Sequence, residues 1–132
     1  MEKHEKNATA IVELLSKHPK IDKIYYPGLT SHPSHTIAKK QQSGFGGMLS
    51  FEILGGLAEV KSFIKGIKIL PLAASLGGFE SLVSHPYTMT HGNLTPNQKK
   101  EVGISESLIR ISAGLENTED LLEAVNLGLE KI

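Results

Sequence analysis

The sequence predicts an α+β fold in which a small, largely antiparallel sheet carries helices on one face. Apolar residues recur at helical spacing near both ends of the chain, over residues 3–17 and 118–130. Short strand-like runs lie between these helices, separated by turns rich in glycine, proline and serine. No internal repeat, low-complexity tract or linker interrupts the 132 residues, so we expect one domain, residues 1–132.

The expected helix at residues 3–17 has a single apolar face, and Pro19 ends it. That face consists of Ala8, Ile11, Val12 and Leu15. The helix begins with a charged run and no capping residue, as a helix cut from a longer one would, so Met1 need not be a natural start. A strand, a short polar helix and a second strand should follow at residues 21–26, 36–42 and 48–53. In the first strand, one side should carry Ile21, Lys23 and Tyr25 and the other Asp22, Ile24 and Tyr26.

The second half of the chain continues this mixture of helices and strands. A helix at residues 57–65 should stop at Gly66, and the last helix, residues 118–130, should be capped by Asn117 or Thr118. The last helix should turn inward Leu121, Leu122, Val125 and Leu129. Between these helices we expect a strand at residues 67–72, a loop of small residues at 73–81 and a possible strand at 82–86. A short helix capped by Thr95 at 95–103 and a strand at 107–116 should follow.

Composition excludes several classes of function. Fourteen basic and 14 acidic side chains cancel, so no overall field attracts nucleic acid or a membrane surface. The absence of cysteine excludes a disulfide scaffold and a zinc ribbon, and it fits a reducing compartment. No apolar run approaches the roughly 20 residues of a membrane-spanning helix, and Met1 is followed by charged residues rather than a signal peptide. We therefore expect a cytoplasmic protein with neither nucleic acid nor membrane as a partner.

Motifs for a complete reaction centre are missing from the chain. There is no Gly-x-Ser-x-Gly elbow, no evident carboxylate pair and no lysine in a context that would desolvate it. The glycine run at residues 44–47 precedes a strand and lacks Gly-Lys-Ser/Thr, so it indicates close packing rather than phosphate binding. His32 and His35 flank Pro33 in a loop, and no cysteine could complete a metal site. We therefore expect no catalytic residue and no metal ligand in this chain.

Arg110 is the only arginine in the sequence, and it lies mid-strand among aliphatic residues. Its planar guanidinium can bind a carboxylate or phosphate through two parallel hydrogen bonds. This favours an anion-binding role, and a structural salt bridge to an acidic side chain is the alternative. The small residues at 73–81 allow backbone N–H groups to approach a ligand closely, or they simply form a tight connection.

Several motifs in fixed order resemble a known family. They lie at residues 26–29, 31–35, 44–50, 75–82, 89–91, 103–105, 108–112 and 114–116. Together they closely resemble the C-terminal part of the Cys/Met-metabolism pyridoxal-phosphate enzymes, along essentially the whole chain. That family includes cystathionine γ-synthase, cystathionine γ- and β-lyases, methionine γ-lyase and O-acetylhomoserine sulfhydrylase.

The resemblance implies a fold-type I, aspartate aminotransferase-like enzyme, of which residues 1–132 would be the small C-terminal domain. The N-terminal domain that binds pyridoxal 5′-phosphate is then absent from this chain and would lie before Met1. That domain would supply the Schiff-base lysine, the phosphate-binding residues and the aspartate facing the pyridine nitrogen. The resemblance also implies a homo-oligomer, a tetramer in the family.

The resemblance further implies which residues bind substrate. In the family, the strand arginine, here Arg110, binds the α-carboxylate of a small amino-acid substrate. Ser75 of the Ser-Leu-Gly-Gly turn lies near that carboxylate and the cofactor lysine, and Leu76 follows it in the same turn. The residue before the serine tunes substrate choice, and Ala74 stands where relatives often carry glutamate or valine. This departure leaves synthase, γ-lyase and β-lyase open.

The implied function is the substrate-carboxylate-binding domain of a trans-sulfuration enzyme acting on sulfur amino acids or homoserine esters. The chain alone is then expected to be inactive and to bind no cofactor. One alternative is a stand-alone module that binds small carboxylates, and another is a non-catalytic interaction subunit. A binding module should bind amino acids by itself, whereas half of an enzyme pocket should not.

Overall fold

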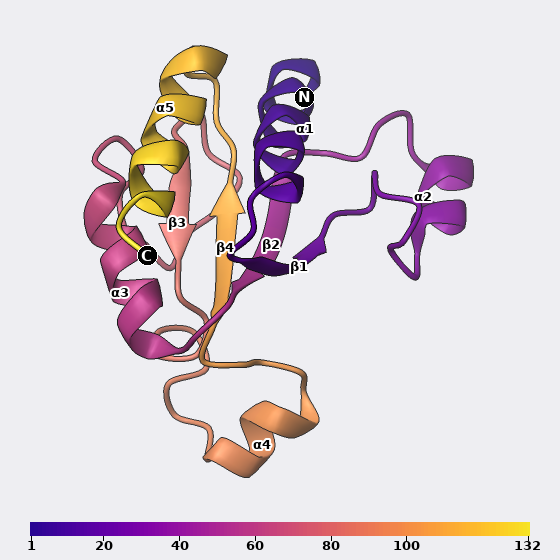
Figure 1. Ribbon diagram of the computed structural model, residues 1–132. Coiled ribbons are helices and arrows are strands. Elements are labelled where there is room, and N and C mark those ends of the chain that lie inside the picture. Colours follow the sequence, from indigo (N-terminus) through magenta and orange to yellow (C-terminus); the bar gives the residue numbers. More distant parts are fainter.

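The computed structural model describes all of residues 1–132 and contains one four-stranded sheet. The strands are β1 (Ile21–Tyr25), β2 (Met48–Ile53), β3 (Leu82–Ser84) and β4 (Leu108–Ser112). Their order in the sheet is β1-β2-β4-β3, and every neighbouring pair is antiparallel (Figure 1). The strand that carries Arg110 is therefore central, with hydrogen-bonded neighbours on both sides.

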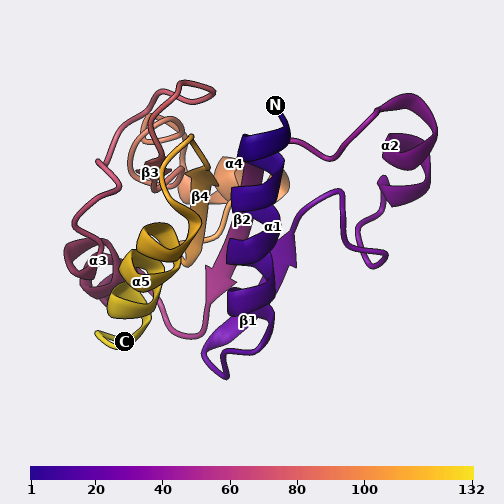
Figure 2. The ribbon, with the colours of Figure 1, turned by 90° about the horizontal axis from the view of Figure 1, so that it is seen from above.

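Five helices surround this sheet. They are α1 (Glu2–Ser16), α2 (His35–Gln41), α3 (Leu57–Gly66), α4 (Pro96–Glu101) and α5 (Thr118–Leu129). Viewed from above, α1 and α5 lie side by side on one face of the sheet, with α3 next to α5 (Figure 2). Helix α2 lies beyond β1, and α4 lies beyond one end of the sheet (Figure 1). The predicted α+β fold is confirmed, and none of the helices is long and apolar enough to cross a membrane.

The hydrophobic core lies between the sheet and the three long helices. The predicted apolar face of α1 is confirmed, because all four of its residues are buried. In α5, Leu121, Val125 and Leu129 are buried, and Leu122 packs against the core from its edge. The largest side chains that are fully inside are Phe51 and Phe63, whose rings meet edge to face.

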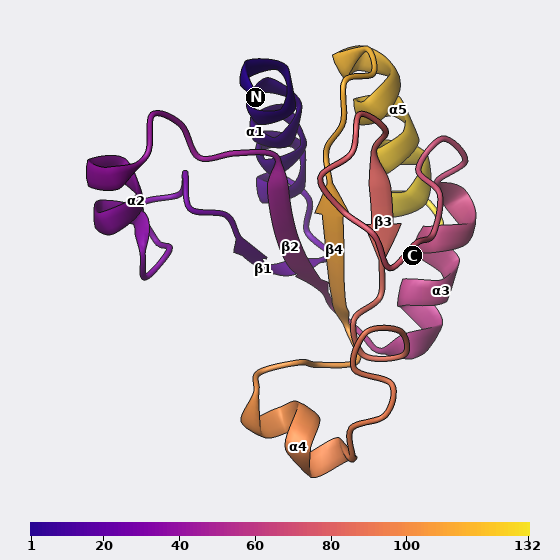
Figure 3. The same cartoon turned by 180° about the vertical axis from the view of Figure 1, so that it is seen from behind.

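The opposite face of the sheet carries polar residues and no helix. Cross-strand pairing aligns Tyr25 with Ser50, Ser50 with Arg110, and Arg110 with Ser84. Directly opposed residues of antiparallel strands point to the same face, so these four side chains form one row across the sheet. Seen from behind, the segment between α3 and β3 crosses this face (Figure 3). That segment contains the loop at residues 73–81.

The expected strand at residues 67–72 is wrong. This segment is irregular, and its one ladder contact is an isolated parallel bridge between Leu72 and Val83. Ala73 N–H donates to Val83 O and Val83 N–H donates to Pro71 O, so the chain runs beside β3 for only three residues. Ile67 and Leu70 are buried, a spacing of three that does not match a strand.

Three smaller expectations also need correction. The alternation predicted for 21–26 is broken by a register shift between Ile21 and Lys23, so that Ile21 and Ile24 both pack against the core. The strand expected over 107–116 ends at Ser112. Gly66 is expected to stop α3, but it is the last residue of that helix and its φ is not positive. A Cβ on Gly66 would lie 2.7 Å from the Cα of Gly128, so close packing of α3 on α5 explains this glycine.

The predicted N-terminal caps of α4 and α5 are confirmed. Asn117 Oδ1 accepts from the backbone N–H of Glu119 at the start of α5. At α4, Thr95 accepts from the N–H of Gln98 while the Gln98 side chain accepts from the N–H of Thr95. This reciprocal pair is a capping box, which satisfies two backbone donors that the helix itself leaves free.

Candidate functional site

Arg110 is held by the loop that crosses the open face of the sheet. Its Nη2 donates to the carbonyl oxygens of Ala74 and Ser75, at 3.2 and 3.1 Å. These acceptors are backbone carbonyls rather than a carboxylate, so the hydrogen bonds do not support the salt-bridge alternative. A guanidinium has five N–H donors, and the three on Nε and Nη1 make no hydrogen bond within the chain. Arg110 is therefore oriented by the loop and keeps donors free for an anion.

The turn around Ser75 has a fixed backbone and exposed side chains. Gly77 adopts a φ of 76°, which favours glycine, and its N–H donates to Ser112 Oγ at 2.9 Å. Ala74, Ser75 and Leu76 are exposed, Leu76 by 52%. The structure thus brings the predicted residues Ala74, Ser75 and Arg110 together, with Leu76 adjacent in sequence.

Two polar residues near this turn were not singled out from the sequence. Ser81 and Glu116 are joined by a pair of hydrogen bonds across 35 residues of sequence. Partial burial of Glu116 opposes its ionisation, but hydrogen bonds from the hydroxyl and N–H of Ser81, a bond from its own backbone N–H and the nearby His4 together lower the pKa of the carboxyl group. Both residues belong to the motifs that resemble the family, and this is the only signal for them in the sequence.

Ser84 is a third residue that the sequence did not single out. It lies opposite Arg110 on the neighbouring strand, its side chain is buried, and its hydroxyl oxygen has no hydrogen-bond partner. The adjacent His85 is fully satisfied, with Nδ1 next to Thr88 Oγ1 and Nε2 next to the carbonyl of Glu106. His85 therefore has a structural role.

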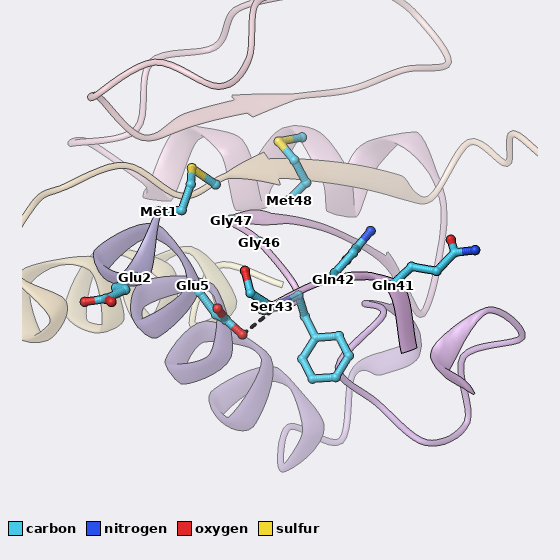
Figure 4. A pocket seen from close by; sticks show the side chains of 11 residues that line it. Met1, Glu2, Glu5, Gln41, Gln42, Ser43, Gly46, Gly47 and Met48 are labelled. Atoms are coloured by element: carbon cyan, nitrogen blue, oxygen red, sulfur yellow. Dashed lines mark hydrogen bonds between the residues drawn. The ribbon is translucent and has the colours of Figure 1, made fainter. Parts of the chain in front are cut away.

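One hollow of the molecule is lined by residues away from Arg110. It measures about 660 Å³ and is formed by the start of α1 and residues 41–48 (Figure 4). Its ionisable side chains are Glu2 and Glu5, with no lysine or arginine among the residues that line it. Glu5 accepts from the N–H of Phe45 at 2.8 Å, which fixes the glycine-rich loop. An acidic hollow of this kind does not favour a carboxylate ligand.

The two loop histidines make hydrogen bonds within the chain. His35 Nδ1 lies 2.8 Å from the carbonyl of Pro27, and its ring stacks on Phe45. His32 Nδ1 accepts from the N–H of Ser34. No three histidine, aspartate or glutamate side chains come together as a metal site would require.

Comparison with known proteins now identifies the family. The family model for the Cys/Met metabolism PLP-dependent enzymes matches residues 1–130. The chain belongs to this family. Its identity to an L-methionine gamma-lyase of Fusobacterium nucleatum subsp. polymorphum is 50% over 132 residues, which is all of this chain and 33% of that protein. Human cystathionine gamma-lyase is 47% identical over 130 residues, covering 98% of this chain and 32% of that protein.

A solved structure of the family has the same fold. Cystathionine gamma synthase from Xanthomonas oryzae pv. oryzae, in complex with aminoacrylate and cysteine, superimposes with a TM-score of 0.95 and 46% identity. The match covers 99% of this chain and 34% of that structure's chain. The chain therefore spans about a third of the length of the family members that it matches.

The cofactor named for the family calls for a lysine, and the lysines of this chain can be placed in the structure. Pyridoxal phosphate needs an amine to hold it covalently, and lysine supplies that amine. Lys99 is the one buried lysine, and its Nζ lies 4.0 Å from the centroid of the Tyr87 ring in a cation–π contact. The remaining lysines are exposed or half-exposed. Arg110, beside the turn before β3, offers a positive charge and N–H donors that suit an anion.

Proposed function

We propose that this chain is the substrate-carboxylate-binding C-terminal domain of a pyridoxal-phosphate enzyme of trans-sulfuration. The parent enzyme would act on sulfur amino acids or homoserine esters, as a cystathionine γ-synthase or a γ- or β-lyase. The cofactor, with its lysine and phosphate-binding residues, would be held by an N-terminal domain of the same parent chain. That cofactor withdraws electrons from the substrate Cα when bound.

The observation that carries this proposal is the orientation of Arg110. A guanidinium held at Nη2 by two carbonyls keeps its charge and three N–H donors for a carboxylate, and a two-bond grip would share Nη2 with the carbonyls or displace one of them. Gripping the carboxylate through two hydrogen bonds orients the amino acid, and this orientation decides which bond at Cα is labilised. Ala74, Ser75 and Leu76 would line the same end of the substrate, with Ala74 tuning substrate choice.

Exposed apolar residues around the turn support a larger parent protein. Leu72, Leu76, Phe79 and Leu115 are exposed by 52%, 52%, 76% and 49%. Apolar side chains gathered near one loop are typical of a surface that another domain or subunit covers. We propose that the N-terminal domain covers this surface, and that the parent forms a homo-oligomer in the cytoplasm.

The proposal is tested in the full-length gene product. Arg110→Lys keeps the charge but loses the planar fork, so kcat/KM for the amino-acid substrate should fall by roughly a hundredfold, mostly through KM. Lys61→Gln, which removes an exposed charge on α3, is the matched control and should leave kcat/KM unchanged. Equal kinetics for wild type and Arg110→Lys would refute the carboxylate role.

A second test concerns the 132-residue chain by itself. It should show no lyase or synthase turnover, and titration with methionine or cystathionine should produce no saturable shift of the Arg110 guanidinium resonances. Saturable binding of an amino acid to the chain would contradict the proposal and favour a stand-alone carboxylate-binding module.

A further inference from the structure

The far end of the loop at residues 73–81 is fixed by a single carboxylate. Glu116 Oε1 accepts from the backbone N–H of Ser81, and Glu116 Oε2 accepts from the Ser81 hydroxyl, each at 2.6 Å. Both oxygens of the carboxylate are therefore bound to one residue. Hydrogen bonds to an ionised acceptor are stronger than neutral ones, so this pair is a firm attachment.

Ser81 also connects the loop to the segment that follows β4. Its hydroxyl oxygen accepts from the N–H of Gly114 at 2.7 Å, and Leu115 N–H donates to Phe79 O at 2.8 Å. The two backbones touch here, because a Cβ on Gly114 would lie 2.4 Å from the Phe79 carbonyl oxygen. The Ser81 hydroxyl thus donates one hydrogen bond and accepts one.

The near end of the loop is fixed to β4 itself. Arg110 Nη2 binds the carbonyls of Ala74 and Ser75, and Ser112 Oγ accepts from Gly77 N–H. Between the two attachments, a Cβ added to Gly77 or Gly78 would meet no atom within 4 Å, so open space surrounds both glycines and they can adopt other conformations easily. The shape of the loop therefore depends on both ends being held by the same continuous stretch of chain, residues 110–116.

We propose that Glu116 is a positioning residue for the carboxylate site: by binding Ser81 through both oxygens, it sets the loop so that Ala74 and Ser75 face Arg110. This inference rests on the proposed function of Arg110. Glu116 itself does not touch the substrate in this arrangement. If the hydrogen bonds between Glu116 and Ser81 are lost, the loop is no longer attached at Ser81. The carbonyls of Ala74 and Ser75 are then held only by the contacts of the loop with Arg110 and Ser112.

The test compares Glu116→Gln with two controls. Gln keeps the shape but carries no charge, so the bond from Ser81 N–H loses its ionised acceptor and the contact with the Ser81 hydroxyl must reverse direction, with the NH₂ group donating. Glu123→Gln removes the charge of an exposed carboxylate on α5 that makes no hydrogen bond within the chain. Val60→Ala, on the buried face of α3, should lower stability and lies outside the loop.

The first readout needs no enzyme activity. Amide hydrogen exchange of Gly77, measured in the 132-residue chain, should speed up at least tenfold in Glu116→Gln. Gly77 lies four residues before Ser81 and bonds Ser112 rather than Glu116, so an effect confined to the Ser81 contact would leave its exchange unchanged. Glu123→Gln should not alter it, and Val60→Ala should alter it only as far as global stability falls.

The second readout is the kinetics of the full-length protein. Glu116→Gln should raise KM for the amino-acid substrate roughly tenfold with a smaller effect on kcat, since the carboxylate grip is loosened rather than removed. Ser81→Ala should behave alike, and the double variant should be no worse than the more damaged single variant, because both act through one contact. Additive losses would overturn the inference.

The two proposals fail in distinguishable ways. If Arg110→Lys leaves the kinetics unchanged, the proposed function is wrong. If Arg110→Lys is damaged while Glu116→Gln matches Val60→Ala in Gly77 exchange and in KM, Glu116 only contributes stability and the positioning role is refuted.

Discussion

The guanidinium of Arg110 hydrogen-bonds the carbonyl of Ser75, a residue 35 positions earlier in the chain. This contact joins a central strand to an otherwise exposed turn, and it leaves the donors on Nε and Nη1 without a partner in the chain. A carbonyl partner fixes the orientation of the arginine without neutralising its charge. The positive charge therefore remains available to a ligand, which a salt bridge to a carboxylate would have prevented.

Gly114 should be intolerant of any side chain. An added Cβ would lie within 2.6 Å of three backbone atoms, in Phe79, Glu80 and Ser81, and backbone cannot rotate away as a side chain can. Gly114→Ala should therefore lower the free energy of unfolding by about 1–3 kcal/mol. Gly78→Ala is the control, because open space surrounds that position and its φ is not in the left-handed region, so its stability should change by less than about 1 kcal/mol. Urea unfolding of both variants checks the difference.

Elements with their own local pattern could be predicted from the sequence. Helix α1 shows its apolar stripe, and α4 shows the Thr95 and Gln98 pair of a capping box. The segment at residues 67–72 resembles a strand in sequence because it is as apolar as one. In the structure the segment pairs with β3 only through the single bridge between Leu72 and Val83. No pattern in the sequence of the segment indicates that its pairing is so short.

The site is predictable only as far as its side-chain chemistry. A lone arginine among aliphatic residues indicates an anion-binding fork, and the small residues at 73–81 indicate close approach of a backbone. The partners of Arg110 are carbonyl oxygens, which every residue carries, so no residue type reveals them. Likewise, Glu116 and Ser81 meet only because β3 and β4 pair, and an acidic residue in a turn has many other uses.

The Glu116 attachment should weaken in acid. Because the pKa of Glu116 is lowered in the folded protein, its contribution is present above the ordinary carboxyl pKa and is lost as pH falls through the folded value. The free energy of unfolding of wild type should therefore fall more steeply with acidification than that of Glu116→Gln. Urea unfolding at a series of pH values between about 7 and 3 checks this. Parallel curves for the two proteins would contradict the assignment, and Ser81→Ala should flatten the acid limb in the same way.

Tyr25 should be the last tyrosine to ionise. Its hydroxyl donates to the Glu52 carboxylate, and this hydrogen bond, partial burial and the charges of Glu52 and Asp22 raise the pKa of Tyr25 to about 12. The raised value means that the contact stabilises the fold below the ordinary tyrosine pKa and is lost as pH rises through about 12. Absorbance titration of the phenolate in Tyr25→Phe should lack the highest-pH step. Glu52→Gln should move that step to lower pH, and an unchanged step would show that Glu52 is not its cause.

Ser81 and Ser84 should respond oppositely to loss of the hydroxyl group. Both are buried, one just before β3 and one at its end, but the Ser81 hydroxyl makes two hydrogen bonds and the Ser84 hydroxyl makes none. The buried Ser84 hydroxyl loses its hydration on folding and gains no hydrogen bond in exchange. Removing the Ser81 hydroxyl, in contrast, leaves Glu116 and Gly114 each without one hydrogen-bond partner. Ser84→Ala should raise the free energy of unfolding by up to about 1 kcal/mol, and Ser81→Ala should lower it by about 1–3 kcal/mol. Urea unfolding at neutral pH measures both. Equal losses of stability in the two variants would mean that the Ser84 hydroxyl has a hydrogen-bond partner, such as a bound water. That partner would add a further polar group to the row of side chains that contains Arg110.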